Sequence, residues 1–289
     1  MPTNAPETMG VIYRLQLSQL HPHPQNPFSI RDDQAMLDLI QSVQSHGVLV
    51  PAIARLRPDG EYEIIAGHRR KHASELAGLD FMPVVVLDLN DDEAIIQLVD
   101  SNIQRENILP SERAKAYKMR MEAMKRQGAR TDLTSPNISA KFRSDDELGQ
   151  EVGVSGDTIR NYASLTNLVP ELMQMVDEGR IKLSPAYQIA ALPHNEQSLL
   201  LDTIESEQST PSLSQAQRMK RLSQNGELNE DALLEIMMEQ KKPVRNDITL
   251  SGEKLRKFFP NSYSPIQMEN VIFKLLEAWQ RKRQRDQSR

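Results

Sequence analysis

The pattern of apolar positions changes character near residue 90. Before it, apolar residues alternate with polar ones over short runs, which is typical of half-buried strands, and two stretches with helical spacing lie between them. The strands are expected at residues 11–15, 48–57, 62–66 and 84–89, and the helices run from Met36 to Gly47 and from Gly67 to about Gly78. These elements predict a small α/β unit.

After residue 90 the apolar positions recur every three or four residues, which predicts helices. We expect them at residues 93–102, 110–127, 145–151, 155–166, 170–178, 184–192 and 229–240, and a last one that begins at Ser264. Ser264, Pro265 and Gln267 form a typical helix start, with a cap, a proline in the first turn and a capping-box glutamine. Polar residues at 128–143 and 206–214 predict connecting segments.

The pattern as a whole predicts an α+β N-terminal domain, an all-α helix-turn-helix domain and a helical C-terminal region. A length of 289 residues is enough for such a division. The expected parts are a disordered tail at 1–10, the N-terminal domain at 11–109, the helix-turn-helix domain at 110–205 and the C-terminal region at 206–289.

Composition narrows the class of protein. The chain has no cysteine, which excludes a disulfide-stapled fold, thiolate metal sites and a cysteine nucleophile. No apolar run is long enough for a membrane span, and the first residues lack the pattern of a signal peptide. We therefore expect a cytoplasmic protein that does not contact membranes.

The net charge of −5 hides strong local differences. Residues 110–144 hold 9 basic and 3 acidic side chains and residues 241–289 hold 12 and 5, whereas residues 1–109 and 145–240 are acidic. A nucleic acid responds to the local potential, so the acidic total does not exclude DNA as a partner. The alternative is that both basic blocks are solvated helix faces.

A glycine and three cations follow the strand expected at 62–66. Gly67 stands where this strand should become a helix, and Arg69, Arg70 and Lys71 come directly after it. Free N–H groups at a helix N-terminus bind anions, glycine permits close approach, and arginine adds bidentate hydrogen bonds. The segment is therefore a candidate phosphate site, although a helix cap followed by exposed charges has the same pattern. It is neither a P-loop nor a GxGxxG motif.

A second polar group runs from Ser101 to Pro110, between two expected helices. It includes Asn102, Gln104 and Arg105. Taken alone, it fits a loop before a proline-initiated helix as well as it fits a ligand site.

Residues 145–164 have the pattern of a helix-turn-helix. Gly149 is small where two short helices must meet, Gly153 suits a turn with positive φ, and Ser155 is placed to cap the second helix. The alternative is an ordinary pair of helices, which the acidic charge of this block favours. In a helix-turn-helix, the second helix would face the major groove with Ser155, Gly156, Asp157, Thr158, Arg160 and Asn161.

The three motifs, in this order, resemble the ParB/RepB partition-protein family over residues 11–195. Gly67–Ala73 resembles the family's Gly-Glu-Arg-Arg-x-Arg-Ala box, and Ser101–Asn107 resembles its Glu-Asn-Ile-Gln-Arg box. The first box is matched by His21–Pro27 and Gly47–Arg57, and the helix-turn-helix with its supporting helices by residues 145–192. The resemblance implies a ParB/sulfiredoxin-like fold for the N-terminal unit. The segment 128–143 and the C-terminal third are most similar to members from mobile elements.

Members of this family are homodimers that bind a palindromic, centromere-like site in double-stranded DNA, usually with a ParA-type ATPase as partner. Many bind CTP with Mg²⁺, close into a clamp and slide on DNA. The resemblance implies the same for this chain, on a nucleoid or a plasmid. By position, Gly67, Arg69 and Arg70, with His68 among them, would hold the triphosphate. Asn102 would coordinate Mg²⁺, and Gln104 and Arg105 would lie near the phosphates.

The sequence departs from the family pattern at three positions. His68 replaces the glutamate of the glycine-arginine box, His72 replaces its later arginine, and Ser101 replaces the glutamate before Asn102. Two carboxylates that could order Mg²⁺ or an attacking water are thereby lost, so CTP hydrolysis should be weak or absent.

The last helix carries an apolar stripe of Met268, Ile272, Leu275 and Trp279. The stripe could pack within the chain. It could also hold two chains together, which would place two helix-turn-helix units at the halves of a palindrome.

Three functions fit the sequence. The first is a sequence-specific DNA-binding partition protein, and the second is a transcriptional regulator of a plasmid or conjugative element with the same fold. The third is an enzyme, either a nucleotidase or a nuclease. A nuclease would need a carboxylate cluster for metal ions, and none lies next to Gly67–His72 in the sequence.

Overall fold

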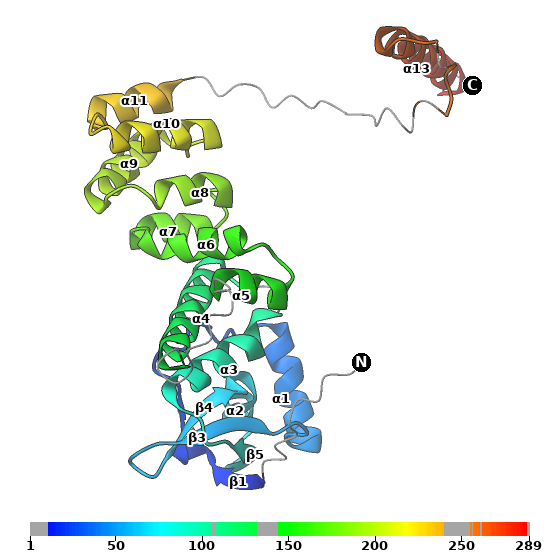
Figure 1. Ribbon diagram of the computed structural model, residues 1–289. Helices are drawn as coiled ribbons and strands as arrows, with labels where there is room; N and C mark the ends of the chain where they lie inside the picture. Colours follow the sequence, from blue (N-terminus) through cyan, green and yellow to red (C-terminus); the bar gives the residue numbers. More distant parts are fainter. Residues whose placement is uncertain are drawn as a thin grey trace. The chain divides into compact units, whose positions relative to one another are not determined.

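The computed structural model describes residues 11–105, 108–131, 144–239, 255, 257–260 and 262–287. The chain forms two compact units, Met1–Glu239 and Gln240–Arg289 (Figure 1). The tail expected at 1–10 lies outside the described residues, as do residues 132–143 of the expected loop. Residues 128–131 were expected in that loop and instead continue the preceding helix.

A five-stranded mixed sheet forms the N-terminal part of the first unit. Its strand order is β1–β5–β3–β4–β2. The pairs β1–β5 and β3–β4 are antiparallel, and β3–β5 and β2–β4 are parallel. The strands are β1 Ile12–Gln16, β2 Leu20–Pro22, β3 Ala52–Leu56, β4 Tyr62–Ala66 and β5 Phe81–Val86, with a 3-10 turn η1 at Leu17–Gln19.

Two strands begin three or more residues away from their expected start. β3 begins at Ala52 rather than residue 48, because Gly47 has a φ of 71° and Pro51 has no N–H to donate to a ladder. β5 begins at Phe81 and includes Pro83. Among the described strands, β5 is paired only on its β1 side at that proline, and pairing with β3 begins one residue later. A proline is tolerated where one side of a strand needs no donor.

The side chains on the two faces of the sheet belong to different apolar cores. On one face Ala54 and Ile64 pack with Leu20 in a core of their own. On the other face Ile65 packs against α3 (Asp91–Ile103) and α4 (Pro110–Thr131). Beside the sheet, α1 (Gln34–His46) packs against α2 (His68–Leu76). The turn from β4 into α2 and the end of α3 thus line the same cavity.

Helices make up the rest of the first unit. They are α5 Ser144–Val152, α6 Gly156–Ser164, η2 Leu165–Asn167, α7 Pro170–Asp177, α8 Leu183–Ile189, α9 His194–Glu207, α10 Leu213–Gln224 and α11 Glu230–Met238. A single apolar core joins α7 to α11. The sequence pattern did not indicate α9 or α10, because their buried sides include polar residues, Gln197 and Thr203 of α9 and Gln215 of α10.

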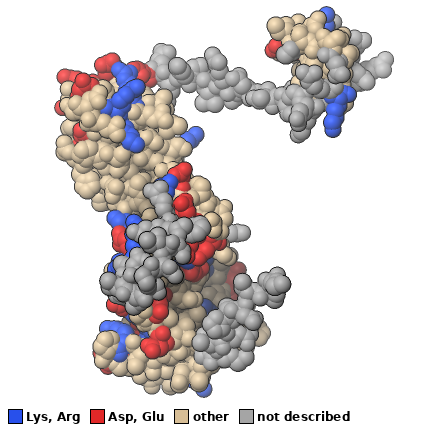
Figure 2. Space-filling model, viewed as in Figure 1, with Lys and Arg blue, Asp and Glu red and all other residues tan. Residues whose placement is uncertain are grey.

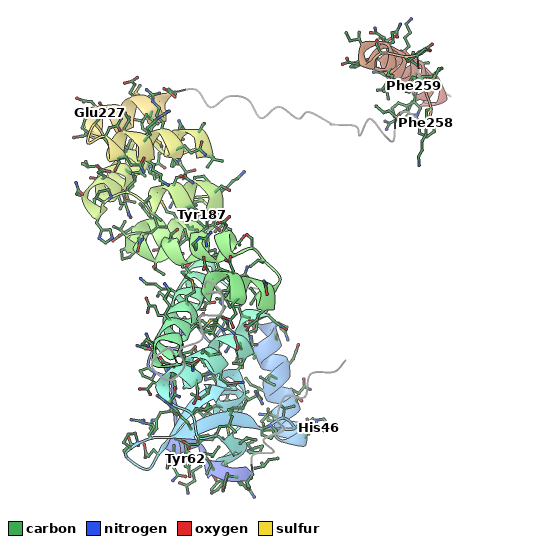
Figure 3. The ribbon with its side chains drawn as sticks, viewed as in Figure 1. His46, Tyr62, Tyr187, Glu227, Phe258 and Phe259 are labelled. Carbon is green, nitrogen blue, oxygen red and sulfur yellow. The ribbon has the colours of Figure 1, made fainter. Side chains whose placement is uncertain are left out.

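The second unit contains α13 (Pro265–Gln287). Ser264 N donates to Gln267 Oε1 at 2.8 Å, and Gln267 N donates to Ser264 Oγ at 3.3 Å. This reciprocal cap confirms the predicted helix start. Phe258 and Phe259, labelled in Figure 3, precede the helix. Across the described parts of both units, no helix combines the length and the apolar character that a membrane span requires.

Candidate functional site

Gly67 forms the turn by which β4 enters α2. Its φ of 104° is in the left-handed region, which favours glycine. A Cβ atom built on Gly67 would lie 2.9 Å from Ala52 Cβ and 3.1 Å from Arg70 Nη2. Among the described residues, no side chain caps the N-terminus of α2. The first N–H groups of this helix therefore have no side-chain acceptor among the described residues, as an anion site requires.

A cavity of about 220 Å³ opens beside this turn. A second cavity of about 200 Å³ adjoins it and shares Phe28, Ser29, Arg69 and Arg105 with it. We call the two together the cleft. The first cavity is lined by Asn26, Phe28, Ser29, Ile30, Ala66, Gly67, His68, Arg69, Arg70, Ser101, Asn102 and Arg105. Two motifs that lie more than thirty residues apart in the sequence thus meet in one place, as the resemblance implied.

Two guanidinium groups of the cleft lie near each other. Arg69 Nη2 donates to Asp33 Oδ1 at 3.1 Å, and Arg105 Nη1 donates to Asn102 Oδ1 at 2.8 Å. Burial lowers the pKa of Arg105, and the positive charge of Arg69 lowers it further. Two cations that raise each other's free energy in a cavity form a favourable place for an anion.

Arg70 has a different environment from Arg69. Its Nη1 donates to the carbonyl oxygens of Val50 at 2.6 Å and Pro51 at 2.5 Å. Burial lowers the pKa of Arg70. Arg70 was expected to hold the triphosphate, but these contacts use it to fix the loop that leads into β3. It lines the cavity all the same.

His68 is the residue of the cleft with an open hydrogen-bond position. Its Nε2 is buried and has no hydrogen-bond partner among the described residues. Burial lowers the pKa of His68 to about 4, and the nearby charges of His23, Arg105 and Lys71 act in the same direction. The imidazole is therefore neutral at pH 7. A buried polar atom without a partner is unfavourable, so this position favours a ligand that hydrogen-bonds to it.

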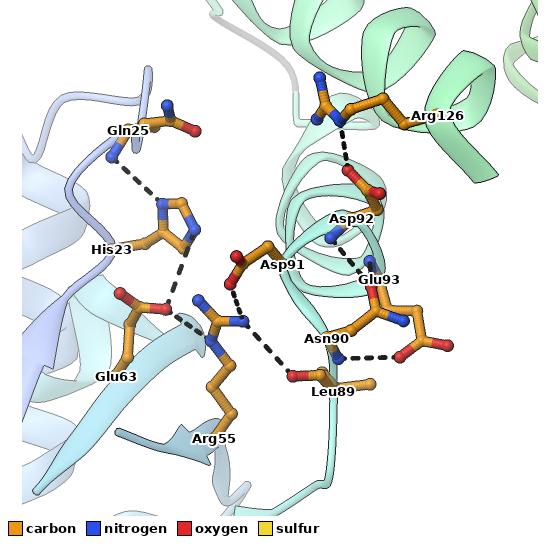
Figure 4. A network of polar contacts seen from close by, with 10 residues as sticks. All are labelled: His23, Gln25, Arg55, Glu63, Leu89, Asn90, Asp91, Asp92, Glu93 and Arg126. Carbon is orange, nitrogen blue, oxygen red and sulfur yellow. Dashed lines mark hydrogen bonds and ion pairs between the residues drawn. The ribbon is translucent and has the colours of Figure 1, made fainter. Parts of the chain in front are cut away.

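An ion-pair network joins the sheet to the first turn of α3 (Figure 4). Arg55 lies 2.7 Å from Glu63 and 2.7 Å from Asp91. His23 Nδ1 accepts from Gln25 N at 3.1 Å, so its Nε2 carries the proton and faces Glu63 Oε2 at 3.9 Å. Burial lowers the pKa of His23. This network could not be predicted from local sequence patterns, because its members come from four separate segments.

Asn102 and Gln104 differ in their positions relative to the cavity. Asn102 lines the cavity, and its Oδ1 already accepts from Arg105, while its Nδ2 donates to Leu98 O at 2.9 Å. Gln104 is exposed at the C-terminus of α3 and lines neither cavity, so its place near the phosphates stays a prediction.

The residues around Asn102 do not by themselves fit Mg²⁺. This ion usually binds one or two carboxylates besides phosphates and water. None of the described residues that line the cavity with Asn102 is a carboxylate. The described part of the chain also contains no group of three or more His, Cys, Asp or Glu side chains placed to hold a metal ion.

The first turn of α4 links the cleft to the helices beyond it, which sequence reasoning missed. Ser29 N donates to Glu112 Oε1 at 2.9 Å, and Ser111 N donates to Asp177 Oδ1 of α7 at 2.9 Å. The guanidinium of Arg113 lies 5.5 Å from the ring centre of Tyr162 on α6. The residue before this helix is Leu109, whose side chain cannot accept a hydrogen bond. Tertiary contacts therefore supply the acceptors that a capping side chain would give.

Tyr162 also packs edge-on against two other tyrosine rings. Its ring centre lies 5.7 Å from that of Tyr117 on α4 and 5.9 Å from that of Tyr187 on α8, which Figure 3 labels. Such edge-to-face pairs have a preferred geometry. The inner side of α6 is therefore fixed in its orientation by α4 and α8.

α5 and α6 form the predicted helix-turn-helix. A Cβ atom on Gly149 would lie 2.6 Å from Val154 O, and Gly153 has a φ of 74°. Ser155 Oγ accepts from Thr158 N at 3.2 Å and so caps α6. The two small residues and the cap have the places that the sequence indicated.

The outer side of α6 carries most of the expected residues. Asp157 and Asn161 are exposed, and Thr158 and Arg160 are partly so. Gly156 was expected to face outward but is buried. A Cβ atom there would overlap Asp146 Oδ1 of α5, so the residue serves the close approach of the two helices. Arg160 forms ion pairs with Asp145 and Asp157.

The basic block at 110–144 is partly neutralised by contacts within the chain. Arg120 is buried and lies 2.7 Å from Asp100, with a further ion pair to Glu151. Arg126 lies 2.7 Å from Asp92. On the face that Figure 2 shows, Lys and Arg atoms of the first unit lie among Asp and Glu atoms. The block therefore presents less positive charge to a partner than its composition suggests.

Two family models match these parts of the chain. The ParB N-terminal domain matches residues 2–103 and the ParB HTH domain matches residues 137–212. The chain belongs to the ParB family. Membership confirms the resemblance drawn from the sequence, and it confirms the expected order of an α/β domain followed by a helix-turn-helix region.

Individual relatives agree with this. The chromosome-partitioning protein Spo0J of Thermus thermophilus is 31% identical over 187 residues, 65% of this chain and 62% of that protein. Stage 0 sporulation protein J of Bacillus subtilis is 32% identical over 174 residues, 60% of this chain and 55% of that protein. The matches thus span about three fifths of these ParB-type relatives.

A solved structure is also similar. It is the C-terminally truncated chromosome-partitioning protein ParB from Caulobacter crescentus complexed with CTP-γ-S, at 28% identity and a TM-score of 0.32, over 63% of this chain and 93% of that one.

Proposed function

We propose that the chain is a DNA-binding partition protein that reads a palindromic duplex through α6 and binds CTP in the cleft. The observation that supports DNA binding most directly is the geometry of α5 and α6. Two glycines permit close packing, Ser155 caps α6, and the first turns of α6 carry an exposed polar face. The chromosome-partitioning names of the relatives support partition as the process.

Positive groups that converge on one cavity support a nucleotide there. The uncapped start of α2, Arg69 and Arg105 suit the oxygens of a phosphate chain. His68 Nε2 offers one further hydrogen bond. CTP as the nucleotide is taken from the resemblance to ParB, as is an Mg²⁺ ion, for which the phosphates would supply most ligands and Asn102 one. Hydrolysis is expected to be weak, because His68 and Ser101 replace carboxylates.

A homodimer is part of the proposal. Leu275 and Trp279 of α13 are exposed within their own unit at 64% and 59%. A second copy of α13 would remove these apolar side chains from water, and two α6 helices could then read two half-sites. Truncation before Ser264 should give monomers by light scattering and weaker binding to duplex DNA. An unchanged dimer after truncation would exclude this role of the helix.

Selection from a pool of randomised duplexes tests the DNA-binding part. The full chain should enrich one palindromic sequence, and the absence of any enriched sequence would overturn the proposal. Calorimetric titration tests the nucleotide part. CTP should bind in preference to ATP, and no binding of CTP at any Mg²⁺ concentration would overturn it. A ParA-type ATPase gene beside the gene for this chain would favour partition over regulation of transcription.

A further inference from the structure

Arg160 on α6 is held by two carboxylates in different environments. Its Nη1 donates to Asp145 in the first turn of α5, and its Nη2 donates to Asp157 one turn earlier on α6. The side chain of Asp145 is 6% exposed, whereas that of Asp157 is 78% exposed. The guanidinium thus bridges a buried anion and an anion in solvent.

The buried Asp145 and the exposed Asp157 hold Arg160 with different strength. A carboxylate in the interior needs a cation and hydrogen bonds, so the pair of Asp145 with Arg160 is costly to break. An exposed ion pair contributes little and gives way easily to another partner. Asp145 therefore fixes the position of the guanidinium, and Asp157 occupies a side of it that another acceptor can take.

DNA supplies such an acceptor. The guanidinium has five N–H donors in a planar fork, and the side chain of Arg160 is 38% exposed. Guanine presents O6 and N7 in the major groove, and an arginine fork on these two atoms is the commonest base-specific contact. The phosphates that flank the groove repel the exposed Asp157, which favours its replacement by guanine.

We propose, on the basis of the DNA-binding function proposed above, that Asp145 is a positioning residue that aims Arg160 at a guanine. Asp157 covers the guanidinium until the base replaces it. Asp145 itself touches no base in this arrangement. Its effect is on which base Arg160 prefers and not on the general attraction to phosphates.

The test compares base preference in the full-length chain. Duplexes with each single base substitution in the selected site compete for the parent, Asp145→Asn, Asp145→Glu and Arg160→Lys. Glu147→Gln is the matched control, because Glu147 is an exposed acid in the same turn of α5 and its change removes the same charge. Arg160→Lys removes the fork, and should lower the preference for guanine at one base pair about tenfold or more.

Asp145→Asn should lower the preference at that same base pair. Glu147→Gln should leave it unchanged, and the salt dependence of non-specific binding should be the same in all the chains. Asp145→Glu keeps a charged partner at a shifted position, so it should lower the guanine preference less. It replaces Asp145→Asn in the test if circular dichroism shows that Asp145→Asn does not fold. Asp157→Asn should strengthen binding to all duplexes and keep the guanine preference.

Two results distinguish a failure of the proposed DNA-binding function from a failure of the positioning role alone. If the parent shows no base preference, both the DNA-binding function and this inference are wrong. If the parent is selective and Arg160→Lys loses one guanine, but folded Asp145→Asn and Asp145→Glu keep it, the positioning role of Asp145 alone is wrong. If Asp145→Asn weakens binding equally at every base pair, the positioning role is also wrong, because such a loss indicates a structural role.

Discussion

Arg105 of the cleft and Arg160 of the helix-turn-helix are held in opposite ways. In the cleft, Arg105 donates to the neutral amide oxygen of Asn102, and its pKa is lowered by burial and by the charge of Arg69. In the helix-turn-helix, Arg160 is matched by the carboxylates of Asp145 and Asp157. Arg105 thus donates to a neutral acceptor, while Arg69 pairs with Asp33. The charge of Arg160 on α6, in contrast, is matched by two carboxylates.

This difference indicates how each site would gain affinity. Among the described residues no carboxylate forms an ion pair with Arg105, so a small anion can enter the cleft and relieve the repulsion between two cations. DNA must compete with carboxylates for Arg160, so α6 should contribute specificity more than attraction. Weak attraction at each α6 fits a protein that depends on two half-sites read together, as proposed for the dimer.

Gly67→Ala, a change within the cleft, should have the largest effect on the free energy of unfolding. The new Cβ would meet Ala52 Cβ at 2.9 Å and the residue would keep a left-handed φ. The two costs together should lower the free energy of unfolding by about 3–5 kcal/mol in urea titrations. Gly60→Ala is the control, because φ there is 84° and the new atom meets nothing within 4 Å. Its cost should be about 1–2 kcal/mol, and equal losses would show that the close approach to Ala52 is unimportant.

Acidification should reveal the buried His68. Its pKa is about 4 in the folded chain against 6.5 for an ordinary histidine, so the unfolded state binds the extra proton first. Stability is therefore lost as the pH falls from 6.5 to 4, by up to about 3 kcal/mol for this group. Urea unfolding of the parent and His68→Gln between pH 7.5 and 4.5 checks this. The variant should be less sensitive to pH, whereas a change at the exposed His46 should not alter the slope.

Arg105→Ala tests whether the positive potential of the cleft serves a nucleotide. The loss of one charged hydrogen bond to phosphate, about 1.5–3 kcal/mol, should weaken CTP binding about 10- to 100-fold in calorimetry. Arg180→Ala is a suitable control, because Arg180 is 52% exposed on another part of the chain. Unchanged CTP affinity in Arg105→Ala would separate the nucleotide from this cleft.

Asp177→Ala tests the junction between the two regions and should have the smallest effect. It removes the acceptor for Ser111 N at the start of α4, which should cost about 1 kcal/mol, as the loss of a helix cap does. Asp202→Ala, an exposed change on α9, should cost less. Urea titration measures both, and equal values would indicate that water replaces Asp177 without loss.

The sequence predicted local features well. Gly67, Gly149 and Gly153 were found because a glycine at a turn between regular elements has a local cause, and Ser155 was found because caps act within one turn of a helix. The meeting of the Gly67 and Asn102 motifs was predicted through the family resemblance and not through the residues alone.

Long-range partners were not predictable. Nothing in the sequence near Arg70 indicates that it donates to the carbonyls of Val50 and Pro51, and nothing near Arg160 indicates the buried Asp145. Arg120 belongs to the basic block at 110–144, yet it is buried and pairs with Asp100 of α3 and Glu151 of α5. Composition states how many charges exist, whereas only the fold states which of them neutralise one another.

Chromatin immunoprecipitation with sequencing, in the organism that encodes the chain, tests the central claim most directly. The account predicts enrichment at a small number of palindromic sites. This enrichment should be lost with Asn161→Ala, since Asn161 is exposed on α6 and a bidentate base contact contributes about 1–3 kcal/mol of discrimination. Enrichment without any common sequence, or the same sites for the parent and Asn161→Ala, would contradict the assignment of α6 as the helix that reads DNA.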